Sequence, residues 1–398
     1  MSAWGSQGRS SESLISKIVP QKLKSVTILP FKLLTSSDVE LLITVFGDKD
    51  CLLVELNATK SIPEPDRLLP LLSAAMAGSR LKSLAIGSMD FTSDHLALLL
   101  KHPLQLSALD LRNKALTTLV SLPQSLTSLD LSRNSGLVLS PLPDLFDLKV
   151  DECDLVTSDL RFLPGTLETL EARLNPKIFE DISGEVAANL GSMKKLVLAD
   201  SPMPPAVLKE LLSCLTATKE LDLTRCIIEA PGADVWDNLP LETLVLAGCK
   251  LELQNVLPRL KVKVLDLSFQ DISGALELLP QMGLRSLKLH GCKLSKADVS
   301  KLSALLTCGL EDLDVTGNDM TSQQVTQFLT PISSSTLTIL AIGGNSCPSD
   351  IDTLLKDTQV EVLKDRPENL NATAMGVPPE FQGEAEGLLR AKGRGLSK

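Results

Sequence analysis

The sequence predicts an α/β solenoid, in which each repeat adds one strand to a parallel sheet and returns along the opposite side. Two observations lead to this prediction. The leucine pattern L-x-x-L-x-L occurs at 106–111 and again at 126–131, and a pattern that recurs about every two dozen residues indicates a repeat architecture. Hydrophobic residues make up 43% of the chain, yet aromatic residues make up only 3% and Tyr is absent. That imbalance fits a core of aliphatic layers.

The pattern continues through most of the chain. Chance supplies one match in a Leu-rich sequence, but not fourteen in one frame, and a degenerate fifteenth copy lies near Val360 in TQVEVL. The second apolar residue of each copy serves as a marker, and the markers are Val26, Val54, Leu84, Leu109, Leu129, Leu148, Leu170, Leu196, Leu221, Leu244, Leu265, Leu287, Leu313 and Leu340.

On these residues the chain resembles the leucine-rich repeat superfamily from about Gln21 to Leu363. The resemblance implies a horseshoe whose parallel strands line the concave side. Because side chains alternate along a strand, Leu109 and Leu111 are expected to face the core and Asp110 the concave solvent.

A second repeated position follows five residues after each marker, where the chain turns away from the sheet. Asn and Cys side chains there are expected to bond backbone groups inside the stack, Cys as the weaker donor. A metal or redox role for the aligned cysteines is the poorer alternative. The residues are Asn134, Cys153, Asn175, Cys226, Cys249, Cys292, Asn318 and Asn345.

Repeat length varies, and this predicts a mixed convex side. Long copies leave room for helices, as in SSDVELLITVF, SDHLALLLKH and the segment after Pro204 and Pro205. Thr321 with Gln324, and Ser295 with Asp298, resemble capping boxes. Short copies carry Pro, and their convex side is expected to be extended or to form a single 3₁₀ turn. A wide helical back curves a solenoid tightly and a narrow back leaves it flatter, so we predict tight curvature at both ends and a flatter stretch from Leu106 to Leu167. The long copies resemble the ribonuclease-inhibitor type and the short ones the shorter bacterial-like types.

Three regions follow from this pattern. Residues 1–20 form a polar leader with a short amphipathic cap, residues 21–363 form the repeat domain of about 14–15 copies, and residues 364–398 form a largely disordered tail. The tail ends in a basic segment with Arg390, Lys392, Arg394 and Lys398, for which an alternative role is tethering to an acidic surface.

The composition limits the classes of partner and the compartment that we expect for this protein. The net charge of −10 argues against nucleic acid, which requires clustered Lys and Arg. No run approaches the roughly 18 apolar residues that cross a bilayer, and the polar beginning lacks a secretory signal. Eight cysteines without a disulfide or zinc spacing indicate a reduced, cytoplasmic protein. We expect a monomer in isolation that binds another protein.

Catalytic motifs are missing. His95, His102 and His290 are scattered and suggest no metal site or base–nucleophile pair. No phosphate-binding loop, nucleophile elbow or dinucleotide fingerprint is present. The sequence therefore predicts no catalytic residues, no cofactor and no metal, although a site assembled from distant residues stays open.

The concave face is the candidate binding surface. The residue after each marker reads Thr27, Glu55, Ala85, Asp110, Asp130, Lys149, Glu171, Val197, Asp222, Val245, Asp266, Lys288, Asp314 and Ala341, of which half are acidic. Arginines follow nearby, so one interpretation is a self-compensating lattice of ion pairs, and the other is a charged docking face. The candidate partner-binding residues are Asp110, Arg112, Asp130, Arg133, Lys149, Glu171, Arg173, Asp222, Arg225, Asp266, Phe269, Lys288, His290 and Asp314.

Aromatic residues are rare here, so two of them stand out. Phe269 is expected to flank the concave sheet, partly exposed, next to His290 and near Arg225, where aromatic and Arg residues favour an interface. Trp236 is expected to anchor a convex loop. The apolar floor around Ile339 and Ala341 either binds a partner or is covered by the tail.

Three functional hypotheses remain open. The first is a non-enzymatic scaffold, adaptor or inhibitor that binds a partner on the concave face. The second is a GTPase-activating protein of the Ran type, for which Arg112 with Asn113 and Arg133 with Asn134 are the candidate groups. The third is a structural subunit or substrate receptor of a larger complex.

Overall fold

The computed structural model describes residues 23–27, 35–59, 65–77, 80–86, 91–101, 105–113, 116–180, 182, 184–228, 232–249, 251–296, 299–356 and 358–364. The predicted N-terminal cap at 1–20, the tail beyond Lys364, His102 and Asp298 lie outside these residues. The chain divides into two compact units, Met1–Leu196 and Val197–Lys398.

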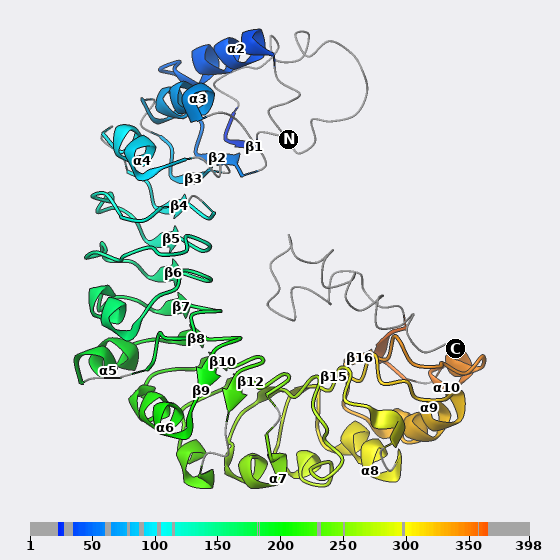
Figure 1. Ribbon diagram of the computed structural model, residues 1–398. Coiled ribbons are helices and arrows are strands. Elements are labelled where there is room, and N and C mark those ends of the chain that lie inside the picture. The colour runs from blue at the N-terminus through cyan, green and yellow to red at the C-terminus, as the bar shows by residue number, and fades with distance from the viewer. Residues whose placement is uncertain are drawn as a thin grey trace, which may run out of the picture. The chain divides into compact units, whose positions relative to one another are not determined.

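A parallel sheet of fifteen strands runs through the described residues, and its strands follow one another in chain order (Figure 1). A separate pair, β9 (Pro202–Met203) and β11 (Ile227–Ile228), lies outside the main sheet. The main strands are β1 (Ser25–Thr27), β2 (Glu55–Ala58), β3 (Ser83–Ile86), β4 (Ala108–Asp110), β5 (Ser128–Asp130), β6 (Asp147–Lys149), β7 (Thr169–Glu171), β8 (Lys195–Val197), β10 (Glu220–Asp222), β12 (Thr243–Val245), β13 (Val264–Asp266), β14 (Ser286–Lys288), β15 (Asp312–Asp314), β16 (Ile339–Ala341) and β17 (Glu361–Leu363).

The strand register confirms most markers and corrects two. Val26 pairs with Leu56, which in turn pairs with Leu84, so the expected marker Val54 is wrong. The concave residue of this copy is Asn57, and Glu55 pairs with Ser25 and Ser83 instead. A shift of two residues preserves the alternation of faces, and Ala58 in place of the third leucine conceals the true frame.

The fifteenth copy is also shifted by two residues. Leu340 pairs with Val362, so the marker lies at Val362 and not at Val360. The segment TQVEVL alternates apolar residues through both positions, and only the pairing to β16 distinguishes them.

The core is a column of aliphatic layers between the sheet and the convex side. Leu109 and Leu111 are 1% and 0% exposed, while Asp110 between them is half-buried. This is the predicted alternation. Burial of a Leu side chain contributes about 2 kcal/mol, and each such layer needs its neighbours, because one repeat alone exposes both of its faces.

The Asn and Cys positions form the predicted internal ladder. Asn134 donates from Nδ2 to the carbonyls of Leu111 (3.0 Å) and Leu131 (2.6 Å), and its Oδ1 accepts from the backbone N–H of Leu116 (3.0 Å). The Cys249 thiol donates to the carbonyl of Leu223 at 2.9 Å and, weakly, to the carbonyl of Ala247 at 3.9 Å. Buried Asn therefore links successive repeats more completely than Cys.

Gln270 occupies the same ladder position and was not expected there. Its Nε2 donates to the carbonyl of Leu246 at 2.6 Å, and its Oε1 accepts from the backbone N–H of Leu251 at 3.3 Å. A glutamine amide offers the same donor and acceptor as asparagine, one methylene further out. The signal for it was its spacing of five residues from Leu265.

Helices cover the convex side of the long repeats, as predicted, and none forms in the described residues between β4 and β6 (Figure 1). The α-helices are α2 (Ser36–Phe46), α3 (Pro65–Ala77), α4 (Ser93–Leu99), α5 (Gly184–Gly191), α6 (Pro205–Cys214), α7 (Leu253–Val256), α8 (Val299–Ser303), α9 (Ser322–Leu329) and α10 (Ile351–Leu354). Short 3₁₀ turns supply the remainder, for example at Thr157–Phe162 and Ala233–Trp236.

Two predicted local features of the convex side are present. At the start of α9, Gln324 N–H donates to Thr321 Oγ1 (3.3 Å) while Gln324 Oε1 accepts from Thr321 N–H (2.9 Å), which completes the capping box. Trp236 is 1% exposed and anchors its loop as expected. Among the described residues, no helix is long and apolar enough to cross a membrane.

Candidate interaction surface

The fourteen candidate residues lie on or directly after the concave strands. Seven belong to the first unit, from Asp110 to Arg173, and seven to the second, from Asp222 to Asp314. Each unit therefore carries a candidate surface of its own.

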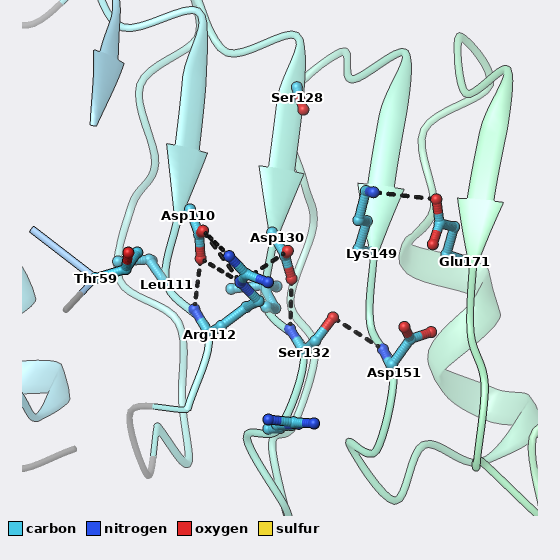
Figure 2. Close-up of polar contacts among 12 residues, drawn as sticks. Thr59, Asp110, Leu111, Arg112, Ser128, Asp130, Ser132, Lys149, Asp151 and Glu171 are labelled. Carbon is cyan, nitrogen blue, oxygen red and sulfur yellow. Dashed lines mark hydrogen bonds and ion pairs between the residues drawn. The ribbon is translucent and has the colours of Figure 1, made fainter. Parts of the chain in front are cut away.

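In the first unit, Arg112 is held between two carboxylates (Figure 2). Its Nη2 lies 2.8 Å from Asp110 Oδ2, and its Nε lies 3.3 Å from Asp130 Oδ2. Burial and the neighbouring charge of Asp110 raise the pKa of Asp130 to about 6, although Ser132 and Arg112 act to lower it. Arg112 therefore does not offset the effect of burial on the pKa of Asp130.

Lys149, Glu171 and Arg173 form a second cluster in this unit. Lys149 Nζ lies 3.1 Å from Glu171 Oε1 (Figure 2), and Arg173 Nη1 lies 2.5 Å from Glu171 Oε2. Arg173 also reaches Asp151 Oδ2 at 2.9 Å. Burial acts to raise the pKa of Glu171, but Arg173 and Lys149 outweigh it and the pKa is lowered. For Asp151, burial outweighs Arg173 and the pKa is raised.

Arg133 pairs with Glu152 at 3.4 Å. Asp151 and Glu152 were therefore missed as members of the surface. Asp151 and Glu152 follow the marker Leu148 by three and four residues. The candidate arginines follow their own markers by the same numbers of residues. In this unit the interpretation as a self-compensating lattice describes the three candidate arginines, Arg112, Arg133 and Arg173, each of which has a carboxylate partner from its own chain.

Five aspartates of the candidate set have a local structural role that sequence reasoning did not include. In each case Oδ1 accepts from the backbone N–H two residues later, at 2.8 to 3.0 Å, where the chain leaves the strand. Such a bond fixes the turn in the manner of an Asx motif. The five are Asp110, Asp130, Asp222, Asp266 and Asp314.

The residue four positions after each marker from Leu109 to Leu340 has a positive φ, which sequence reasoning also missed. Glycine accepts this left-handed conformation readily, and other residues pay about 1 kcal/mol or more. The residues are Asn113, Arg133, Glu152, Leu174, Asp200, Arg225, Gly248, Phe269, Gly291, Gly317 and Gly344, with φ between 55° and 73°. Two large apolar residues, Leu174 and Phe269, stand in this column.

Phe269 and His290 lie side by side in the second unit, as predicted. Their ring centroids are 4.9 Å apart in an edge-to-face arrangement, and Phe269 is 44% exposed. His290 Nδ1 is 2.6 Å from Thr316 Oγ1, which itself donates to Asp314 Oδ1 at 2.6 Å. Because the single hydroxyl proton is directed at Asp314, the imidazole Nδ1 is the donor to Thr316.

Glycines make room for these rings. A Cβ on Gly291 would lie 3.0 Å from Phe269 Cδ1, and one on Gly317 would lie 2.8 Å from His290 Cε1. Each ring leans over the left-handed position of the next repeat, where only glycine leaves enough space.

The remaining charges of the second unit are less completely paired. Arg225 Nε and Nη2 contact both carboxylate oxygens of Asp200, at 2.6 and 2.5 Å. Lys288 Nζ lies 4.0 Å from Asp266, a carboxylate whose pKa is raised by burial. Within the described part of the chain, no ion pair joins Asp222 or Asp314 to a cation.

Two alternative chemistries gain no support from these positions. The described residues include no group of three or more His, Cys, Asp or Glu side chains that could hold a metal. Asn134 is 0% exposed and bonds backbone groups, and Arg112 is engaged by two aspartates. Asn134 is therefore a structural group of the ladder, and Arg112 is held by carboxylates of its own chain.

Comparison with known proteins identifies the fold. No protein-family profile and no curated protein matches the chain. Among solved structures it is similar to a TLR13–ssRNA13 complex, with 20% identity, 79% of this chain, 50% of that chain and a TM-score of 0.50. It also matches LegL7 from Legionella pneumophila (18% identity, 60% of this chain, 92% of that chain, TM-score 0.42). An internalin, InlF, from Listeria monocytogenes matches at 16% identity over 89% of this chain and 93% of that chain (TM-score 0.40).

The class that this comparison and the parallel sheet define is the leucine-rich repeat solenoid. Similarity at these identities establishes the fold and leaves the ligand to be argued from the site.

Proposed function

We propose that this protein is a non-enzymatic interaction module that binds a partner protein through its concave strands. The observation that carries the proposal is the pairing of exposed Phe269 with His290 on the concave side of the second unit. Exposed aromatic residues in rigid surroundings are frequent interface anchors, and the sheet fixes both residues on adjacent repeats. The leucine-rich repeat fold supports a general role in protein binding.

A protein is the proposed partner and nucleic acid is not. The TLR13 structure contains single-stranded RNA, but the net charge here is −10 and the concave strands of the second unit carry more acids than bases. Phosphates would be repelled by such a surface. The proposal includes no membrane contact, a monomer in isolation and the cytoplasm, where the eight free thiols would stay reduced.

The test uses the full-length protein. A partner captured from native extract is purified, and its affinity is measured for wild type, Phe269→Gly and Asp222→Asn. The matched control replaces exposed Gln323 and Gln327 on the convex helix α9 with Ala. We expect the concave variants alone to weaken binding, Phe269→Gly by about tenfold or more.

Arg133→Glu and Arg173→Glu are less suitable variants, because each would place another carboxylate beside Glu152 or beside Asp151 and Glu171. Loss of folding would then imitate loss of binding. Equal affinity of all concave variants, with weaker binding only in the α9 control, would favour the alternative of a structural subunit that assembles through its convex helices.

A further inference from the structure

We propose that the concave face of the second unit binds the chain's own segment 388–398. The surface is the acidic–apolar patch, defined as Phe269, His290, Asp312, Asp314 and Ile339. The inference rests on the proposed function, because it assigns the chemistry that the same face recognises: apolar side chains interspersed with lysine and arginine.

The fold does not require a phenylalanine at position 269. It has φ +60° in the left-handed column, where the neighbouring repeats carry Gly248 and Gly291. Those repeats complete the same turn without a side chain, so the turn itself needs none. The ring remains 44% exposed, and it packs edge-to-face on His290 at 4.9 Å. Phe269 therefore presents a fixed apolar surface to the concave side.

The acidic part of the patch lies on β15. Asp312 and Asp314 flank the buried Leu313, so both carboxylates face the concave side. Asp314 accepts from Thr316, and Asp312 accepts from Thr338 Oγ1 at 3.3 Å. Neither carboxylate forms an ion pair with another described residue. Lys288, the register partner of Asp314, approaches Asp266.

This arrangement contrasts with the first unit, where Arg112, Arg133 and Arg173 each pair with carboxylates of the same chain. In the second unit, two adjacent acids are left for cations from elsewhere. Ile339, the register partner of Asp312, is 38% exposed and adds a second apolar position. The patch thus offers acids between two apolar side chains.

Segment 388–398 has the complementary composition. Its sequence, LLRAKGRGLSK, contains three leucines, four cations and no acid. Opposite charges guide such an encounter, and apolar contact supplies affinity.

The segment is also within reach. Twenty-three residues, 365–387, separate Lys364 from Leu388. A linker of that length would reach at most about 80 Å if fully extended, and an average of about 27 Å would apply to a random coil. β15 lies two strands from β17, about 10 Å at the usual strand spacing, and β13, which precedes Phe269, lies four strands away, about 19 Å. A tether of this kind gives an effective concentration near the millimolar range.

The experiment measures binding of a fluorescein-labelled peptide of residues 387–398 by fluorescence anisotropy. The receptor is the full chain with Arg390→Glu, Lys392→Glu and Arg394→Glu, whose own segment no longer matches the patch. We expect the peptide to bind this receptor and to bind the wild-type chain at least about tenfold more weakly, since the wild-type segment competes within its own chain.

Variants in the receptor locate the peptide. Phe269→Gly, and separately Asp312→Asn with Asp314→Asn, are expected to weaken binding about tenfold. Leu174→Gly is the matched control, because Leu174 has the same left-handed conformation and the same 44% exposure in the first unit. It should leave peptide affinity unchanged. Circular dichroism melting of every variant verifies that each remains folded.

Equal peptide affinity for wild type and the charge-reversed chain would overturn the inference, as would no binding at all. Retained binding in both patch variants would overturn it too. If the wild-type segment competes with the peptide more strongly as protein concentration rises, the segment binds a second copy of the chain. That result would contradict the within-chain contact proposed here. A separate measurement tests the proposed function. The affinity for the partner protein is measured for the concave variants in the chain that carries the charge-reversed segment, and an unchanged affinity would mean that the proposed function fails while the inference on the segment stands or falls by the peptide measurements.

Discussion

The side-chain amide of Asn318 donates to the carbonyl oxygen of Leu289, one repeat earlier, at 2.8 Å. The same amide donates to Val315 and Thr316, and Oδ1 accepts from the backbone N–H of Leu294 at 3.3 Å. Asn318 is 0% exposed, so no water replaces a lost partner at this position. Asn318 therefore ties its own repeat to the one before it through a single side chain.

Asn318→Ala is expected to lower the free energy of unfolding by about 3 to 5 kcal/mol, since several buried backbone groups lose their partner at once. Asn318→Cys should cost about half as much, because Cys occupies this position in other repeats and its thiol bonds the preceding repeat's carbonyl. Urea unfolding of both variants measures the difference. Equal losses would show that the thiol bond contributes nothing.

The ladder cysteines are expected to resist alkylation in the folded protein. Burial raises the pKa of Cys153, Cys226 and Cys292 to about 12, so at pH 8 only about one thiol in ten thousand is ionised. Cys214, Cys308 and Cys347 are partly exposed. Iodoacetamide followed by peptide mass spectrometry should modify these three first, and the ladder only after unfolding. Early modification of Cys153 would contradict the ladder.

Local pattern predicted the strand frame, the ladder and the exposure of Phe269, because each depends on period and on residue type within one repeat. The second copy was misplaced because Ala58 stands where leucine was expected. Its frame is fixed by pairing to β1 and β3, which no single repeat contains.

The left-handed column could not be predicted from residue type, because its occupants range from Gly291 to Phe269. Its conformation is imposed by the stack. Ion pairs such as Arg173 with Asp151 join different repeats, so they depend on register and rotamer together. The aspartate turn bonds had a usable signal, the recurrent L-D-L pattern followed by a turn, which was interpreted only as surface charge.

Gly317→Ala is expected to destabilise the protein by about 2 to 3 kcal/mol. A left-handed conformation costs alanine about 1 kcal/mol, and the new Cβ would lie 2.8 Å from His290 Cε1. Gly283→Ala is the control, because Gly283 has φ +66° with nothing within 4 Å of the added Cβ. It should show the conformational cost alone. Equal unfolding free energies for the two variants would mean that the His290 ring moves aside freely.

Ionisation of the Asp130 carboxyl group is expected to lower the stability of the fold, and ionisation of the Glu171 carboxyl group is expected to raise it. The pKa of Asp130 is about 6 in the folded protein against 3.8 for the ordinary carboxyl. Its folded state therefore holds the proton more tightly, and stability falls as pH rises from about 4 to about 6. Asp130→Asn keeps the acceptor for Ser132 N–H and should stabilise the protein at pH 7, by roughly 3 kcal/mol at most. The gain should vanish below pH 4.

Glu171 is the matched control for this measurement. Its pKa is lowered from 4.5 in the folded protein, so its contribution is present above that value and is lost as pH falls through the folded pKa. Glu171→Gln should therefore destabilise the protein at pH 7 and make little difference in strong acid. Urea midpoints for both variants between pH 3 and pH 8 measure the two slopes. Slopes of the same sign would mean that Arg112 compensates Asp130 as completely as Arg173 and Lys149 compensate Glu171.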